Sequence, residues 1–374
     1  MDLLIVNGIV LDPSQGICGP FDVGVTEGKI ADWFAPGTVQ AGLATEVVDA
    51  AGCFVVPGLI DLHTHVFERR TALGIKADKV GIRQGVTTLV DAGSTGSRDF
   101  PAFLREVVEL NQTQVLLWIN IASQGLCDGR SELADLSLLK PDETERLIKQ
   151  FPLIRGIKAR MSRSVVKDSG LQPLVMAKRL AQRVGLPVMV HIGNAPPKLG
   201  EILDLLDSGD VVTHAFHGKQ GGLLDENGQL IPEAVCAMER GVLWDVGHGS
   251  SSFSFQTMKR IKELGLSPFS ISTDIYCENI RGPVHSLITT MNKYLAMGYP
   301  LEDVIAAVTW RPARILGLAD ELGTLKKDTV ADLTILKWIA EPITLVDSEA
   351  EQMVGNPYLR AVNTIKSGKV WRHD

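Results

Sequence analysis

The two ends of the chain contain short segments rich in apolar and β-branched residues, separated by turn residues such as Asn7-Gly8, Glu27-Gly28 and Ser367-Gly368. This pattern predicts β-strands joined by tight turns. The expected strands are Leu3–Val10, Asp22–Thr26, Lys29–Phe34, Ala331–Lys337, Val362–Lys366 and Lys369–Arg372. We therefore predict that residues 1–54 and 320–374 pair into one small β-sandwich domain.

Between these ends, apolar strand-like runs alternate with helical stretches. The strand candidates cover residues 55–62, 86–91, 115–122, 153–158, 187–192, 210–214, 242–246 and 269–273. The helical candidates are Pro101–Leu110, Glu143–Gln150, Leu174–Val184, Pro232–Arg240 and Thr257–Leu264. This alternation predicts an α/β fold with a parallel sheet, and eight strands close a (β/α)8 barrel, here over residues 55–319. An open doubly wound sheet is the alternative, and the lack of a GxGxxG motif after an early strand counts against it.

Composition and charge narrow the class of protein. The chain has 374 residues, of which 45% are hydrophobic and 22% charged, as in an ordinary globular protein. Its formal charge of −7 argues against a nucleic-acid or anionic-membrane partner. No apolar run reaches the roughly 20 residues that span a bilayer, and the N-terminus lacks the basic segment of a secretory signal. The five cysteines form no CxxC pair, so we expect reduced thiols in a cytoplasmic protein.

Polar residues stand at the carboxyl ends of the expected strands, where a (β/α)8 barrel carries its chemistry. They are His63 and His65 on the first strand, Lys158 and Arg160 on the fourth, His191 on the fifth, His214 and His217 on the sixth, His248 after the seventh and Asp274 on the eighth. One such residue would be unremarkable as a core or surface group. Their coincidence at one end of the barrel predicts a functional site.

The residue types are those of a metal centre. Side chains alternate along a strand, so His63 and His65 point to the same side. Neutral imidazoles suit zinc and similar first-row ions, and a carboxylate such as Asp274 helps to balance the charge. A buried lysine near cations loses its proton easily. Lys158 can then add CO2 and become a carbamate, an anionic group able to bridge two metals.

The ordered set His63-Thr64-His65, Lys158, His191, His214 and Asp274 resembles the amidohydrolase superfamily, specifically its binuclear-metal members with a carboxylated lysine. The resemblance implies that His63, His65 and Asp274 hold one divalent ion, that His191 and His214 hold the second, and that carboxylated Lys158 and a hydroxide bridge the two, most readily zinc ions. It also implies that the hydroxide attacks a scissile carbonyl, while Asp274 passes the proton to the leaving group.

Within the superfamily, the segments Gly156–Ser162 and Thr213–Gly218 resemble a deacetylase group that acts on N-acetyl amino acids and O-acetylated 2-hydroxy acids. This implies a small carboxylate-bearing substrate and, by family habit, a homo-oligomer. Arg160 is the expected catalytic partner, because its guanidinium can stabilise an oxyanion or clamp a carboxylate. A salt bridge to a barrel carboxylate is the alternative role for Arg160. Further expected substrate contacts are Ser94, His217, His248, Tyr276 and His285.

Two other functions remain open from the sequence. A cyclic-amide hydrolase of the dihydroorotase or hydantoinase kind would need the same metal centre. Dihydroorotases usually carry an arginine two residues after the second histidine, where this chain has Phe67, and Arg69 and Arg70 come later. A metal-free barrel that serves as a binding scaffold is the non-enzymatic alternative, and the presence of all six expected ligands counts against it.

Overall fold

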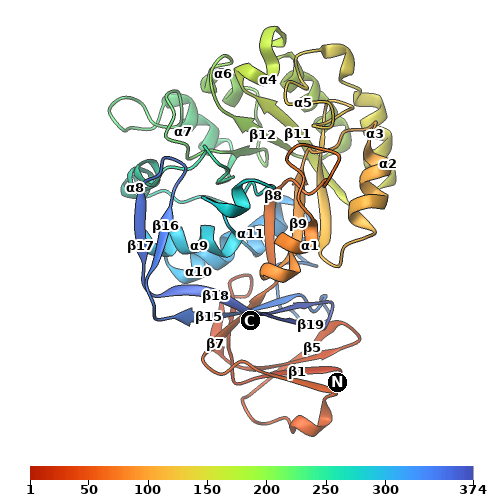
Figure 1. Ribbon diagram of the computed structural model, residues 1–374, viewed down its shortest axis with the longest axis vertical. Helices are drawn as coiled ribbons and strands as arrows, with labels where there is room; N and C mark the ends of the chain where they lie inside the picture. The colour runs from red at the N-terminus through yellow and green to blue at the C-terminus, as the bar shows by residue number, and fades with distance from the viewer. Residues whose placement is uncertain (374) are drawn as a thin grey trace.

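A computed structural model describes residues 1–373 of the chain. Figure 1 shows a large body in which helices surround a curled sheet, and a smaller β-rich part beneath it that contains both chain ends. No helix in the described residues has both the length and the apolar character that a membrane crossing requires.

The large body is built on a parallel sheet with the strand order β14-β13-β12-β11-β10-β9-β8. Its strands are β8 (Leu59–Thr64), β9 (Val86–Ala92), β10 (Gln114–Asn120), β11 (Ile154–Met161), β12 (Val188–Ile192), β13 (Val211–Thr213) and β14 (Leu243–Trp244). The expected eighth strand is irregular. It pairs at Ser270 with Asp245 on one side and at Ile275 with Thr64 on the other, so this segment closes the ring between β14 and β8. The fold is the predicted (β/α)8 barrel.

Helices cover the outside of the barrel (Figure 1). They are α1 (Ala77–Val80), α2 (Phe100–Phe103), α3 (Pro141–Gln150), α4 (Arg163–Val166), α5 (Gln172–Val184), α6 (Leu199–Leu203), α7 (Pro232–Glu239), α8 (Phe255–Glu263), α9 (Leu287–Ala296), α10 (Leu301–Ala307) and α11 (Trp310–Ile315). The apolar faces of most of these helices pack with strand residues in one large buried core, and a second apolar cluster includes Ile60, Leu62 and Trp118 of the strands and Ala313 of α11. The helix expected over Pro101–Leu110 differs, because after α2 the turns widen into a π-helix over Leu104–Val108.

The smaller part consists of two packed sheets. One has the order β19-β18-β15-β7-β2-β3 and the other β5-β4-β1-β6. The strands are β1 (Leu3–Val6), β2 (Ile9–Asp12), β3 (Ile17–Pro20), β4 (Asp22–Thr26), β5 (Lys29–Phe34), β6 (Glu46–Asp49), β7 (Cys53–Pro57), β15 (Leu333–Ile339), β18 (Tyr358–Lys366) and β19 (Lys369–Arg372). Apolar side chains from both sheets share one buried cluster, which joins the two ends of the chain.

Two details of the β-rich segments differ from expectation. The single strand expected over Leu3–Val10 is split by Asn7, whose φ of +63° turns the chain between β1 and β2. An unexpected hairpin, β16 (Ile343–Val346) and β17 (Gln352–Gly355), packs against α9. In its turn, the Asp347 carboxylate accepts a hydrogen bond from the Phe255 N–H at the start of α8, so the hairpin ties into the barrel.

The strand expected over residues 55–62 is also two strands, and Gly58 marks the switch between them. β7 pairs with β15 in the small part, whereas β8 pairs with β9 in the barrel. A Cβ atom on Gly58 would collide with Thr87 Oγ1 and lie 2.9 Å from Asp332 Cβ. The chain can cross from one sheet to the other at this point because glycine allows that close approach.

Gly58→Ala should therefore destabilise the protein by about 1–3 kcal/mol through overpacking. Gly42→Ala is the matched control, because a Cβ there meets no atom within 4 Å. The free energy of unfolding from urea titration checks this, and equal stability of the two variants would contradict it.

Candidate metal centre

His63 lies at the carboxyl end of β8 and His65 directly after it, and both rings are directed at Asp274. Both residues are buried, with 1% and 4% exposure. Each Nε2 atom approaches the same carboxylate oxygen, Asp274 Oδ1, at 3.3 Å for His63 and 3.1 Å for His65. These three ligand atoms lie within 4.8 Å of one another, close enough to hold one metal ion.

Asp274 reaches this position because Asp61 holds the eighth segment against β8. The Asp61 carboxylate accepts hydrogen bonds from the Thr273 N–H at 3.0 Å and the Thr273 hydroxyl at 2.5 Å. The Asp274 N–H then donates to His63 O at 2.7 Å. Asp274 has a φ of +49°, a conformation that costs energy and often marks a functional residue.

Lys158, His191 and His214 come from the facing side of the barrel. Lys158 Nζ lies 3.3 Å from His63 Nε2, and its buried stem runs past Gly93, where any Cβ would lie 2.8 Å from Lys158 Cγ. The His191 and His214 rings meet edge to face with centroids 4.3 Å apart, and the His63 and His214 centroids are 5.1 Å apart. The six side chains proposed as ligands therefore converge at one end of the barrel.

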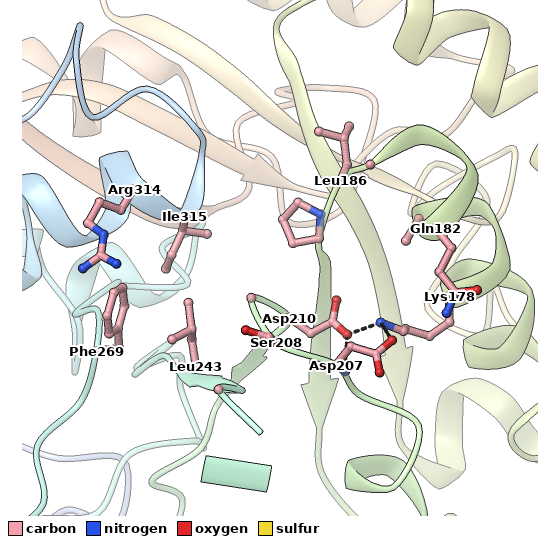
Figure 2. Close-up of a pocket in the computed structure, with 15 residues that line it drawn as sticks. Lys178, Gln182, Leu186, Asp207, Ser208, Asp210, Leu243, Phe269, Arg314 and Ile315 are labelled. Carbon is pink, nitrogen blue, oxygen red and sulfur yellow. Dashed lines mark hydrogen bonds and ion pairs between the residues drawn. The ribbon is translucent and has the colours of Figure 1, made fainter. Parts of the chain in front are cut away.

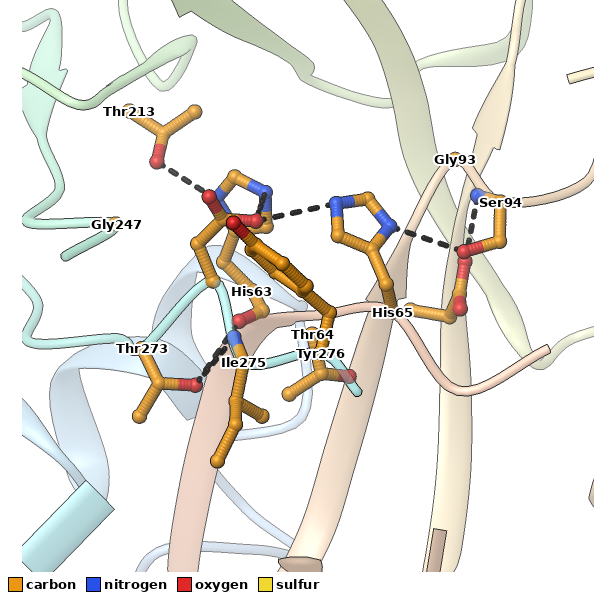
Figure 3. A network of polar contacts seen from close by, with 12 residues as sticks. His63, Thr64, His65, Gly93, Ser94, Thr213, Gly247, Thr273, Ile275 and Tyr276 are labelled. Atoms are coloured by element: carbon orange, nitrogen blue, oxygen red, sulfur yellow. Dashed lines mark hydrogen bonds and ion pairs between the residues drawn. The ribbon is translucent and has the colours of Figure 1, made fainter. Parts of the chain in front are cut away.

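Hydrogen bonds at the outer ring nitrogens leave the inner nitrogens of His63 and His65 directed at Asp274. His63 Nδ1 contacts Thr213 Oγ1 at 2.8 Å, and His65 Nδ1 contacts Ser94 Oγ at 3.0 Å (Figure 3). His214 Nδ1 contacts Gly247 O at 2.5 Å, while its buried Nε2 atom has no hydrogen-bond partner in the described chain. Imidazoles that bind metals are oriented by a partner at the other nitrogen in this way. The residues present therefore fit a divalent metal ion.

The protonation preferences agree with ligand behaviour. Burial lowers the pKa of His214 to about 3 and lowers the pKa values of His63 and His191, so these rings are neutral. Burial also lowers the pKa of Lys158 to about 7, which makes the neutral amine accessible near neutral pH. Burial raises the pKa of Asp274, but the hydrogen bond with His65 and the electrostatic interactions with His214, His65 and Lys158 lower it by more. The net pKa is below the ordinary value, so the carboxylate is ionised.

A cavity of about 240 Å³ opens next to these residues and includes His65, His191 and Asp274 in its wall. Arg160 and Tyr276 also line it. Arg160 Nη1 forms an ion pair with Glu132 Oε2 at 3.2 Å, which is the alternative role considered for this arginine. The Arg160 side chain is nevertheless 14% exposed toward the cavity, so it can both pair with Glu132 and meet a ligand.

The other expected substrate contacts lie in different places. Ser94 holds His65, as described. His217 is buried and accepts the Lys219 N–H at Nδ1, in the wall of a neighbouring pocket. His248 is fully buried against Phe253, with Nε2 2.7 Å from Lys293 Nζ, and it does not line the cavity. His285 is exposed and is not among the residues that line the cavity. Tyr276 does line the cavity, and its hydroxyl contacts the hydroxyl of Ser250.

Several residues that hold the site side chains in place were not predicted from the sequence. Glu132 orients Arg160, Asp245 accepts the Thr213 hydroxyl at 2.7 Å, and Asp91 accepts the Ser94 N–H at 2.7 Å. Asp91 and Asp245 lie on or directly after apolar strands, and this is the signal that could have found them. Glu132 lies in a loop far from Arg160 in sequence, so no local signal points to it.

Another cavity, of about 490 Å³, lies at the opposite end of the barrel, where β12, β13 and β14 begin. Figure 2 shows the residues that line it. In the wall of this cavity, Lys178 forms ion pairs with Asp207 and Asp210, which compensate its positive charge. Arg314 stacks over Phe269 in the same wall. In (β/α)8 barrels this end serves stability rather than chemistry, and the paired charges agree with that role.

Comparison with known proteins decides the family. The model of the amidohydrolase family matches residues 54–371. The chain belongs to the amidohydrolase family. A protein named deacetylase from Enterococcus faecalis (strain ATCC 700802 / V583) is 39% identical over 376 residues, covering 99% of both chains. A deacetylase from Agrobacterium fabrum (strain C58 / ATCC 33970) is 36% identical over 329 residues, covering 87% of this chain and 80% of the relative.

Solved amidohydrolase structures agree in fold but bear other names. A structure described as an adenine deaminase has a TM-score of 0.93 and 38% identity, with both chains covered over 100% of their length. A structure described as a dihydroorotase has a TM-score of 0.91 and 30% identity, covering 100% of this chain and 99% of its own. The chain is thus an enzyme of a hydrolase family whose members generally use a divalent metal centre, and the non-enzymatic scaffold is disfavoured.

Replacing Thr213 with valine removes the hydroxyl between Asp245 and His63 while keeping the side-chain volume. We expect metal affinity to fall by about 10–100-fold, as for other residues that orient a metal ligand. Thr144→Val is the control, because this buried threonine donates only to Lys140 O in α3. Competition with a chelator measures the affinity, and unchanged affinity in Thr213→Val would contradict the role of this contact.

Proposed function

We propose that this amidohydrolase removes an acyl group from a small carboxylate-bearing substrate, an N-acyl amino acid or an O-acetylated 2-hydroxy acid. The observation that carries the proposal is the position of Arg160. It follows Lys158 by two residues on β11, so both side chains lie on the inner face of one strand. A fixed cation beside a metal centre suits a substrate that places a carboxylate next to its scissile carbonyl.

The proposed ligands form two groups. His63, His65 and Asp274 would hold one divalent ion, which we expect to be zinc, and His191 and His214 would hold the second. Lys158, as its carboxylated derivative, would bridge them. Metal ions in such a site polarise a carbonyl oxygen and lower the pKa of water toward neutrality.

The protein's own groups have separate tasks in this proposal. Asp274 is ionised and lines the cavity, so it can accept a proton from the attacking water and deliver it to the leaving group. Arg160 would bind the substrate carboxylate or the developing oxyanion through N–H groups not committed to Glu132. Glu132 is buried and keeps the guanidinium in place.

The pattern around residue 67 favours this proposal over ring opening of dihydroorotate. Phe67 is fully buried, and its ring packs edge to face on Phe103 with centroids 5.2 Å apart. Arg70 pairs with Glu106 instead of lining the cavity. The position from which dihydroorotases usually hold their substrate carboxylate is therefore apolar here.

Acetate release from a panel of N-acetyl amino acids and O-acetyl 2-hydroxy acids tests the proposal. The metal-loaded enzyme should hydrolyse members of this panel at least tenfold faster, by kcat/KM, than it opens dihydroorotate or deaminates adenine. Asp274→Asn should reduce kcat by about 10²–10⁴-fold, because an amide cannot accept the proton. Faster turnover of dihydroorotate or adenine would replace the proposed function.

Lys158→Ala tests the bridging role separately from activity. Loss of a ligand should lower the metal content below two equivalents per chain and also reduce turnover. Lys178→Ala is a useful control, because Lys178 is a buried lysine at the opposite end of the barrel. Full metal content and full activity in Lys158→Ala would rule out a lysine carbamate as a ligand.

A further inference from the structure

The cavity beside the metal centre is unusually cationic and polar. Three cationic residues, Arg130, Arg160 and Lys219, contribute to its wall. Five serines also line it, namely Ser162, Ser164, Ser250, Ser251 and Ser252. Imidazoles aside, Tyr276 is the one aromatic ring and Leu73 the one large aliphatic side chain among the described lining residues. A wall of this kind favours a charged ligand over an apolar one.

The three cations differ in depth and in their existing partners. Arg160 is the deepest and is paired with buried Glu132. Lys219 is half-buried, and its ammonium contacts the Ser251 hydroxyl at 3.2 Å. Arg130 is exposed at the rim. In the described chain, no ion pair with a carboxylate is found for Lys219 or Arg130, so their charge is not cancelled by the protein.

The position of Lys219 is set by the protein. It lies five residues after His214 on the loop that follows β13, and its N–H donates to His217 Nδ1 at 3.1 Å. His217 is itself buried. Burial lowers the pKa of Lys219, which indicates that the ammonium is partly removed from water. A partly desolvated cation without a carboxylate partner is costly unless a ligand supplies the anion.

We propose that the amine or alcohol portion of the substrate, from which the acyl group is removed, carries a second anionic group, which Lys219 binds, with Arg130 assisting at the rim. The inference rests on the proposed function, because it names the class of molecule from which the acyl group is removed. Arg160 would take the carboxylate beside the scissile bond, and Lys219 the anion farther from the metals. N-acyl derivatives of acidic amino acids and O-acetylated hydroxydicarboxylic acids have this chemistry.

Binding of two four-carbon ligands, hydroxysuccinate and 2-hydroxybutyrate, tests the proposal on the metal-loaded enzyme. Both present a 2-hydroxy acid to the metals, and they differ in the second carboxylate. Calorimetry should show that hydroxysuccinate binds about tenfold more tightly, the size of one charge-assisted hydrogen bond in a partly buried site. Lys219→Met should reduce that preference to about twofold, Arg130→Met should reduce it less, and Lys219→Arg should retain it.

Lys149→Met is the matched control, because Lys149 is exposed on α3 and pairs only with Glu145. It should leave the preference unchanged. Equal affinity of the wild type for both ligands, or an undiminished preference in Lys219→Met, would overturn the second anionic subsite.

Hydrolysis separates this proposal from the proposed function. The subsite predicts a higher kcat/KM for N-acetylaspartate than for N-acetyl-2-aminobutyrate, lost in Lys219→Met. If substrates without a second anionic group are hydrolysed equally well and the binding preference is absent, the subsite fails and the deacylase function stands. If the binding preference depends on Lys219 but no acetate is released from any member of the panel, the subsite stands and the proposed function fails.

Discussion

The structure depends on keeping a dense group of imidazoles, an amine and a carboxylate in the dry end of a barrel. Buried polar groups are costly unless each has a partner. Three buried aspartates support several of these groups. Asp61 binds Thr273, next to Asp274, Asp91 accepts a hydrogen bond from Ser94, which contacts His65, and Asp245 accepts a hydrogen bond from Thr213, which contacts His63. The inner nitrogens of His63 and His65 are thereby directed at the carboxylate of Asp274. The contacts that hold the barrel strands together therefore also hold the site residues in place.

The irregular eighth segment shows how this constraint shapes the fold. Three hydroxyls of this segment donate hydrogen bonds to buried carboxylates. Those of Ser270 and Ser272 donate to Asp245, and that of Thr273 donates to Asp61. Three of the four residues 270–273 are polar where an ordinary inner strand has an apolar run, and the segment pairs through single bridges. In return, Asp274 is placed within reach of both His63 and His65. The loss of regular strand structure coincides with the position where the site needs a carboxylate.

Much of this could be predicted from the sequence, for a physical reason. Inner strands of a parallel barrel are continuous apolar runs, so a histidine, lysine or aspartate at the end of such a run stands out. This signal found the group around His63 and Lys158. It could not separate histidines that face the axis from those that do not. His248 has the same local pattern, yet its ring packs on Phe253 and its Nε2 contacts Lys293, another buried lysine.

The contacts beyond the metal ligands could not be predicted, because they join loops that are distant in sequence. Glu132 and Arg160 meet across 28 positions, and only the folded barrel shows that they pair. The ion pair with Glu132 bears on the role that Arg160 can have in the site. An ion pair through Nη1 cancels part of its charge, but it also fixes a planar group in the wall of the cavity. The two interpretations of this arginine, salt bridge and substrate clamp, are therefore compatible. A guanidinium already held by a buried carboxylate loses less conformational entropy when a substrate arrives.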